Sequence, residues 1–284
     1  MASFLSRQEQ LSILHLLVEG ASLRSITRLT GIHRTTAINL MVRVGTQLAA
    51  FMDERMRNLD LWHLECDEIW TFCRKKQHRL TDQEILNTSI RDQYLFVALD
   101  LETKLIPSWV LGKRTAENAR ALMVDLASRI VTPPLFSREP RPQISTDGFN
   151  AYPNAVDLAF AGTVDYRVLI KDYQPAEQPG RYGPPEMIGA VRQVITGRID
   201  RFSICTSHVE RHNLTIRTFM RRFTRLALGF SKKLPNLEAA IALYLAYYNF
   251  CWMHGSLPGT PALAARIAGH PWTLEELLTH AEQM

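Results

Sequence analysis

The sequence predicts an α/β protein in which a mixed sheet lies between an all-helical N-terminal unit and a helical C-terminal extension. Over the first sixty residues, apolar side chains recur at helical spacing. From residue 62 the pattern changes to short runs of aromatic and aliphatic residues, as strands have. Helical spacing then dominates from about residue 206 onward. We therefore expect three domains, at 1–60, 61–234 and 235–284.

Composition excludes several classes of protein. Of the 284 residues, 46% are hydrophobic and 21% are charged, as in a globular rather than a disordered chain. No long apolar segment follows Met1, and the longest apolar run, 239–250, is too short to span a bilayer. The net charge of +5 mildly favours an anionic partner. We predict a soluble intracellular protein without a membrane partner.

The first sixty residues predict a helix-turn-helix unit. Ser6 caps a first helix, which ends at Gly20. A short helical segment runs from Ser22 to Gly31, and a longer helix starts at His33. The longer helix presents side chains of the kinds that reach base edges and phosphates, namely Arg34, Thr35, Thr36, Asn39 and Arg43. A plain helical hairpin with a solvated polar face fits the same periodicity.

Five short runs predict the strands of the sheet. They cover 62–72, 94–99, 106–111, 142–146 and 164–170. A helix over 115–130 precedes the fourth run, and a second helix precedes the fifth. Three strands, a helix, a strand, a helix and a strand make a mixed α/β layer.

The stretch 172–201 interrupts this alternation. Its prolines and glycines indicate a loop inserted into the fold, with one short helix over 185–195. A basic helix follows, then a long apolar helix over 237–251 and two short helices. Thr273 and Glu276 form a capping box for the last helix.

The basic helix contains one acid among many cations. Between residues 206 and 234 the acid is Glu210, and the cations are Arg211, Arg217, Arg221, Arg222, Arg225, Lys232 and Lys233. Helical phase places Glu210, Asn213, Arg217 and Arg221 on one face. The core face carries Val209, Ile216, Met220 and Phe223. An oxygen ligand beside so many cations indicates metal-dependent chemistry on nucleic acid, although a solvated basic face fits too.

Three acids occupy positions suited to a metal site. Asp67 interrupts an apolar strand, Asp147 ends the fourth strand before Gly148, and Glu210 lies in the first turn of its helix. Converging carboxylates repel one another, and divalent cations relieve that repulsion. Two Mg²⁺ ions about 4 Å apart activate an attacking hydroxyl and stabilise a leaving 3′ oxygen. Taken singly, Asp147 also fits a turn residue and Glu210 a partner of the helix dipole.

Five motifs occur in an order that resembles a known family. They are Leu-Glu-Cys-Asp-Glu-Ile-Trp at 64–70, Gly-Lys-Arg-Thr at 112–115, Thr-Asp-Gly at 146–148, Glu-Arg-His-Asn-Leu at 210–214 and Phe-Ser-Lys at 230–232. From about residue 61 to about residue 248, the chain resembles the transposases of the insertion-sequence-one family of bacterial mobile elements.

The resemblance implies a ribonuclease-H-like fold and a DDE triad that binds two Mg²⁺ or Mn²⁺ ions. The triad maps onto Asp67, Asp147 and Glu210. The implied activity is cleavage and joining of double-stranded DNA at the ends of the element. A homodimer or higher oligomer on DNA is expected, because joining two ends needs two active sites. The implied location is the bacterial cytoplasm, in association with the nucleoid. Arg211, Asn213 and the later Arg and Lys residues of the basic stretch would then follow the DNA backbone.

The chain departs from the family pattern in two ways. No cysteine pair of a zinc finger precedes Asp67, and the 172–201 insertion lengthens the separation of Asp147 from Glu210. The alternatives for the third acid are Asp172, Glu186 and Asp200.

Two other functions fit the same residues. One is a DNA-binding repressor or decayed copy of the element without catalysis. The other is a ribonuclease-H-like nuclease that cuts DNA without joining it.

Overall fold

The N-terminal part of the chain consists of three helices. The computed structural model describes residues 5–174, 186–197, 205–225 and 227–284. The first helices are α1 (Arg7–Val18), α2 (Leu23–Thr30) and α3 (Arg34–Arg55). The predicted helix starts are confirmed, since Ser6 forms a capping box with Glu9 and the Ser22 side chain accepts from the Ser25 amide. Gly31 ends α2 with a φ of 72°, a left-handed conformation that glycine adopts readily.

A six-stranded mixed sheet follows. Its strands are β1 (His63–Cys73), β2 (Arg91–Asp100), β3 (Ser108–Gly112), β4 (Gln143–Asp147), β5 (Asp165–Gln174) and β6 (Glu186–Thr196). The spatial order is β3-β2-β1-β4-β5-β6. β1, β4 and β5 are parallel, whereas β2, β3 and β6 each run antiparallel to the preceding neighbour in the chain. Two short 3₁₀ turns, Gln77–Arg79 and Asp82–Glu84, lie between β1 and β2.

The sixth strand corrects two predictions. Five strands were expected, and 185–195 was expected to contain a short helix; instead β6 pairs antiparallel with β5. β4 occupies one edge of β5, and the opposite edge offers unpaired backbone groups to a returning strand. The β-branched Val191, Val194 and Ile195 also favour an extended chain. Residues 175–185 of the predicted loop lie outside the described residues.

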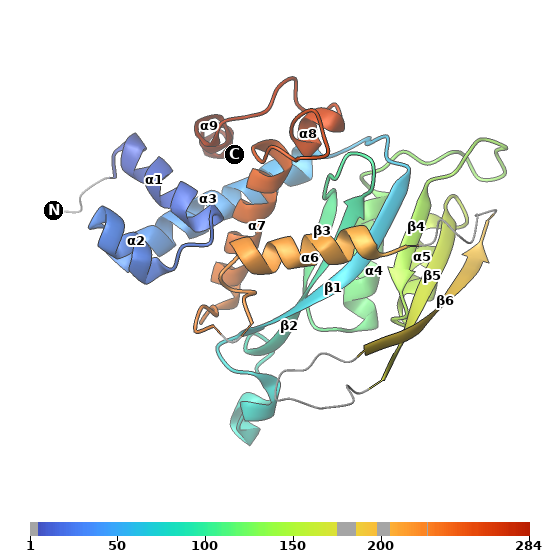
Figure 1. The fold of residues 1–284 in the computed structure, drawn as a ribbon, viewed down its shortest axis with the longest axis horizontal. Coiled ribbons are helices and arrows are strands. Elements are labelled where there is room, and N and C mark those ends of the chain that lie inside the picture. Colours follow the sequence, from blue (N-terminus) through green and yellow to red (C-terminus); the bar gives the residue numbers. More distant parts are fainter. Residues whose placement is uncertain (1–4, 175–185, 198–204, 226) are drawn as a thin grey trace.

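Helices cover both faces of the sheet (Figure 1). Helices α4 (Ala116–Ala127) and α5 (Tyr152–Phe160) lie on the far face in this view, and α6 (Ser207–Phe219) crosses the near face over β1. Right-handed crossovers explain why α4 and α5 share a face, because α4 connects β3 to β4 and α5 connects β4 to β5, and both connections join parallel strands and advance across the sheet in the same direction. The opposite face of the sheet is the one that α6 crosses.

Helix α7 (Leu234–Phe250) connects the sheet to the N-terminal helices (Figure 1). A Cβ added to Gly45 of α3 would lie 2.0 Å from the Ala239 carbonyl oxygen, so only glycine permits this close helix crossing. Toward the sheet, the buried Asn249 of α7 contacts the segment between β2 and β3: its side chain accepts from the Ile106 amide and donates to the Ile106 carbonyl, both at 3.0 Å. Helices α8 (Pro261–Ala264) and α9 (Leu274–Glu282) complete the chain.

Buried apolar side chains from all three predicted domains form one continuous core cluster. The proposed boundaries near residues 60 and 235 remain predictions. None of the described helices combines the length and apolarity that crossing a bilayer requires.

Candidate functional site

Two polar rows cross the sheet beneath α6. The register aligns Glu65 of β1 with Ser145 of β4 and Arg167 of β5. Because side chains alternate along a strand, residues two or four positions later lie on the same face. The second row therefore contains Asp67 and Asp147. Lys171 lies on the same face of β5, two residues beyond Leu169, which the register pairs with Asp147. Sheet register thus brings together side chains that are distant in sequence.

The first row anchors α6. Glu65 is fully buried, and its Oε2 accepts from the Val209 amide in the first turn of α6 at 2.9 Å. No side chain at the cap residue itself supplies this acceptor. Arg167 lies in the same row and donates to the Ser145 hydroxyl at 2.5 Å. Burial raises the pKa of Glu65 to about 7, against the lowering effects of the α6 amides and the Arg167 charge.

The second row and a neighbour form a group of three acids. One carboxylate oxygen each from Asp67, Glu68 and Asp147 lies within 4.8 Å of the others. Burial, and then the charge of Asp147, raises the pKa of Asp67 to about 7. The same two causes raise the pKa of Glu68 to about 8. Burial also raises the pKa of Asp147. Such an arrangement is costly without a compensating cation.

Helix α6 places Asn213 directly over the acids. Its Nδ2 donates to Asp67 Oδ2 at 2.7 Å, and the residue is 8% exposed. The amide oxygen, Oδ1, is buried without a hydrogen-bond partner within the described residues. The sequence predicts that Asn213 shares the face of Glu210 toward the metal site and also contacts DNA. Its side chain contacts the first predicted acid, and the DNA contact remains a prediction.

Glu210 lies near this group but is not one of its three members. Its Oε1 accepts from the Thr206 hydroxyl at 2.6 Å and pairs with the Lys171 ammonium. Its charge nevertheless contributes to raising the pKa of both Asp67 and Asp147, whereas Lys171 opposes that effect. Lys171 therefore contacts the third predicted acid and acts electrostatically on the first two.

Glu68 is a member of the acid group that the sequence pattern does not predict. Alternation along β1 turns Glu68 away from the α6 face, which made Asp67 the only acid of interest there. However, β1 continues past the last residue of β4, and there the side chains of both Asp67 and Glu68 approach Asp147. The Glu68 side chain is 3% exposed, and its Oε1 has no partner among the described residues. The available signal was two adjacent acids inside an otherwise apolar strand.

Of the three alternatives for the third acid, the structure describes the side chain of Asp172 alone. Asp172 is exposed and alternates with Lys171, so it points away from the α6 face. The Glu186 side chain and all of Asp200 lie outside the described residues.

The basic stretch after Glu210 divides into exposed and inward-facing cations. Helix α6 ends at Phe219, so the prediction that Arg221 continues the face of Glu210 and Asn213 is wrong. The chain turns there because Met220 and Phe223 are buried while Arg222 is directed inward. The Arg222 Nε donates to the Ser231 hydroxyl at 2.9 Å, and burial lowers its pKa to about 10. The exposed cations are Arg211, Arg221, Arg225, Lys232 and Lys233.

Two further predicted contacts already have protein partners. Arg217 is half-buried and donates to the Phe223 carbonyl at 3.4 Å. Arg43 on α3 donates to Gln10 Oε1 at 2.8 Å. Arg34, Thr35 and Asn39 are exposed, and Thr36 is half-buried. DNA binding by this helix remains a prediction.

The acid group fits a hard divalent cation. Carboxylate and amide oxygens are the ligands that Mg²⁺ and Mn²⁺ take in proteins. Asp67, Asp147 and Glu68 supply carboxylates, and the partnerless Oδ1 of Asn213 and Oε1 of Glu68 are acceptors that lack a donor within the described residues. Asp67 and Asp147 would hold the metal, and Glu68, Asn213 and Glu210 offer further oxygen atoms beside them.

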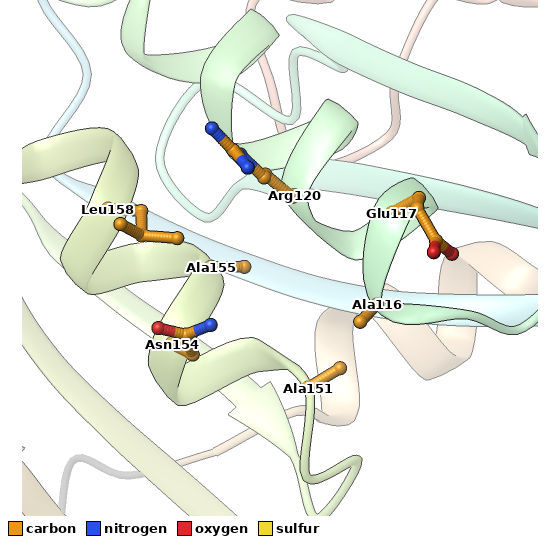
Figure 2. A pocket seen from close by; sticks show the side chains of 7 residues that line it. All are labelled: Ala116, Glu117, Arg120, Ala151, Asn154, Ala155 and Leu158. Atoms are coloured by element: carbon orange, nitrogen blue, oxygen red, sulfur yellow. The ribbon is translucent and has the colours of Figure 1, made fainter.

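A separate hollow lies between α4 and α5 (Figure 2). It is lined by Ala116, Glu117, Arg120, Ala151, Asn154, Ala155 and Leu158. None of these is a predicted site residue, and the lining offers a single acid, so the hollow is not a second candidate for the metal.

The stability of the metal-free protein is expected to fall between about pH 4 and about pH 8. Glu65, Asp67 and Glu68 have folded pKa values of about 7, 7 and 8, above the ordinary values of 4.5, 3.8 and 4.5. In this window the folded state holds protons that the unfolded state has released, so raising the pH favours unfolding. Millimolar Mg²⁺ should therefore raise the melting temperature more at about pH 8 than at about pH 6.

Thermal melts at the two pH values, with and without Mg²⁺, test this expectation. Burial lowers the pKa of His212 to about 3, so this residue makes stability rise with pH, opposite to the acids. The rise due to His212 is complete above about pH 6.5. An equal Mg²⁺ effect at both pH values would contradict the assignment of Asp67 to a metal site.

No protein-family model and no curated protein sequence matches the chain. Among solved structures, it is similar to the Mos1 strand transfer complex, at 14% identity over 59% of each chain with a TM-score of 0.22. It is also similar to a piggyBac transposase synaptic complex with hairpin DNA, at 10% identity over 97% of this chain and 70% of that one, with a TM-score of 0.44. A Mos1 paired-end complex with the left transposon end gives 14% identity over 59% and 60%, with a TM-score of 0.23. The aligned region thus covers less than two thirds of the two Mos1 chains, 59% and 60% of their lengths.

Proposed function

We propose that the chain is a DDE transposase of the insertion-sequence-one type, which cleaves and joins DNA strands at the ends of a bacterial element. The observation that carries the proposal is the meeting of Asp67 and Asp147 on adjacent parallel strands, beneath a helix that begins with Glu210 in its first turn. These are the three acids on which the motif resemblance falls. The order β3-β2-β1-β4-β5 also suits a ribonuclease-H-like fold, with β6 as an added edge strand.

Asp67 and Asp147 would hold Mg²⁺ or Mn²⁺, with Glu210 as the third acid. Two such ions supply activation of an attacking hydroxyl and stabilisation of the leaving 3′ oxygen. The protein supplies rigid positions: Asn213 fixes one oxygen of Asp67, and Glu65 fixes the first turn of α6. No covalent bond between protein and DNA is required, since a freed 3′ hydroxyl can attack the target strand directly.

The DNA would approach along the exposed cations that follow Glu210. Arg211, Arg221, Arg225, Lys232 and Lys233 are exposed and suited to phosphate contacts. Helix α3 would bind the element's ends through Arg34, Thr35 and Asn39. Because two ends must be joined, we propose that the active species on DNA is a dimer or higher oligomer.

The decisive experiment incubates the purified protein with a supercoiled plasmid that carries the coding sequence and its flanking DNA. Nicking and strand joining are followed in Mg²⁺ or Mn²⁺, with EDTA as the control. Cleavage with joined products supports the proposal. Cleavage without joining would assign the chain to the nucleases, and salt-sensitive binding without cleavage would assign it to the non-catalytic DNA-binding proteins.

The third acid is tested in the same assay by comparing Glu210→Gln with Glu68→Gln. Glu210 belongs to the matching motif, whereas Glu68 belongs to the observed acid group. Loss of activity in Glu210→Gln with activity retained in Glu68→Gln supports the proposed triad. The reverse result would replace Glu210 with Glu68.

A further inference from the structure

Arg114 lies at the edge of the acid group, in the link between β3 and α4. Its Nη2 is 3.6 Å from Glu68 Oε2 and 3.5 Å from Asp147 Oδ2. Its guanidinium carbon lies 4.3 Å from the centre of the Phe149 ring. The side chain is 41% exposed. One guanidinium therefore touches two acids of the site and still faces solvent.

These contacts are looser than those of a structural arginine in the same chain. Arg129 is 9% exposed and approaches Asp125 Oδ2 and Asp53 Oδ1, each at 2.7 Å. Charge-assisted hydrogen bonds in proteins are about 2.7–2.9 Å long. The Arg114 contacts exceed that length, and its Nε and Nη1 have no hydrogen-bond partner in the described part of the chain. Most of its donors are available to a ligand.

Phe149 keeps the guanidinium near the metal site. The Phe149 amide donates to Asp147 Oδ1 at 3.0 Å, and its ring packs edge-on against Tyr152. The ring is thereby fixed relative to Asp147, and the arginine lies over the ring. The neighbouring cation does not share this position, because the Lys113 Nζ donates to the Asp92 carbonyl at 2.8 Å.

We infer that Arg114 binds the non-bridging oxygens of the DNA phosphate that reaches Asp67 and Asp147. This inference rests on the proposed function. Divalent cations at the acid group compensate the charges of Glu68 and Asp147, so the guanidinium can exchange two loose carboxylate contacts for a phosphate. The planar fork of Arg matches phosphate geometry with two parallel donors, which a lysine cannot reproduce. The Gly-Lys-Arg-Thr motif at 112–115 thus acquires a role in substrate binding.

The test compares Arg114→Gln and Arg114→Lys with Arg120→Gln. Arg120 is an exposed arginine on α4 that borders the hollow in Figure 2, and its substitution removes the same charge from a nearby position. Binding of a duplex taken from the flanking DNA is measured by fluorescence anisotropy in Ca²⁺ at several salt concentrations. Plasmid nicking in Mn²⁺ at saturating DNA gives the rate, and Mn²⁺ titration gives the metal affinity.

Arg114→Gln is expected to reduce the salt slope of DNA binding by about one phosphate contact. Its nicking rate should fall by about 10²-fold or more, with Arg114→Lys in between. Mn²⁺ affinity and melting temperature should be unchanged or higher, because a cation that competes for Glu68 and Asp147 is gone. A merely structural role would instead lower both.

If Arg114→Gln and Arg120→Gln bind DNA with equal salt slopes, the inference is overturned, whether or not the wild type nicks DNA. Absence of nicking by the wild type would refute the proposed function alone. Wild-type nicking with an unimpaired Arg114→Gln would refute the role of Arg114 and leave the proposed function intact.

Discussion

Asp67→Asn should abolish metal-dependent nicking and yet make the metal-free protein more stable. The substitution removes a metal-binding charge, so activity should fall by at least about 10³-fold. At about pH 8 the same change removes a buried carboxylate whose pKa burial and Asp147 raise from 3.8 to about 7. One pKa unit corresponds to about 1.4 kcal/mol, so the gain in unfolding free energy is on the order of 1–4 kcal/mol. The new amide keeps an oxygen that can accept from Asn213.

The measurement pairs the plasmid assay with urea unfolding at about pH 8 in EDTA. Asp172→Asn is the matched control, because Asp172 is exposed on β5 and lies outside the acid group. It should leave both quantities near the wild-type values. An Asp67→Asn protein that is inactive but less stable than the wild type would indicate a structural role for this carboxylate.

This opposition between activity and stability explains why the sequence alone singles out Asp67. A carboxylate between apolar neighbours in a strand has no local reason to be there, and it therefore indicates a function. Asp147 is visible in the sequence for a different reason, since acids at the carboxyl end of a parallel strand face the usual position of α/β sites. The first five strands and the helix caps are also local properties, and the structure confirms them.

The features that escaped prediction depend on register or on the surroundings of a segment. Lys171 reaches Glu210 only because β5 pairs with β4 and continues past its end, which no local pattern encodes. The strand β6 forms because the edge of β5 is open, although the same residues fit a short helix. The basic helix ends at Phe219 because burial of Met220 and Phe223 turns the chain, whereas helical periodicity alone would continue it.

Glu65→Ala should release α6 from the sheet and produce the largest loss of stability among single substitutions at the site. Glu65 is fully buried, accepts from the Val209 amide and compensates the charge of the buried Arg167. Removing one member of a buried charged pair costs about 3–5 kcal/mol, and the amide additionally loses its acceptor. Because the first turn of α6 also carries Glu210, nicking should fall together with stability.

Glu65→Gln separates the two effects. The amide oxygen can still accept from Val209, so α6 should remain docked, while the compensating charge for Arg167 is lost. We expect a smaller loss of about 1–3 kcal/mol and activity that survives at low temperature. Protection of the α6 amides in hydrogen exchange reports docking directly, and it should fall in Glu65→Ala but not in Glu65→Gln. Equal protection in both variants would show that Glu65 does not hold the helix, and the position of Glu210 over the aspartates would then depend on Asn213 and the apolar face of α6.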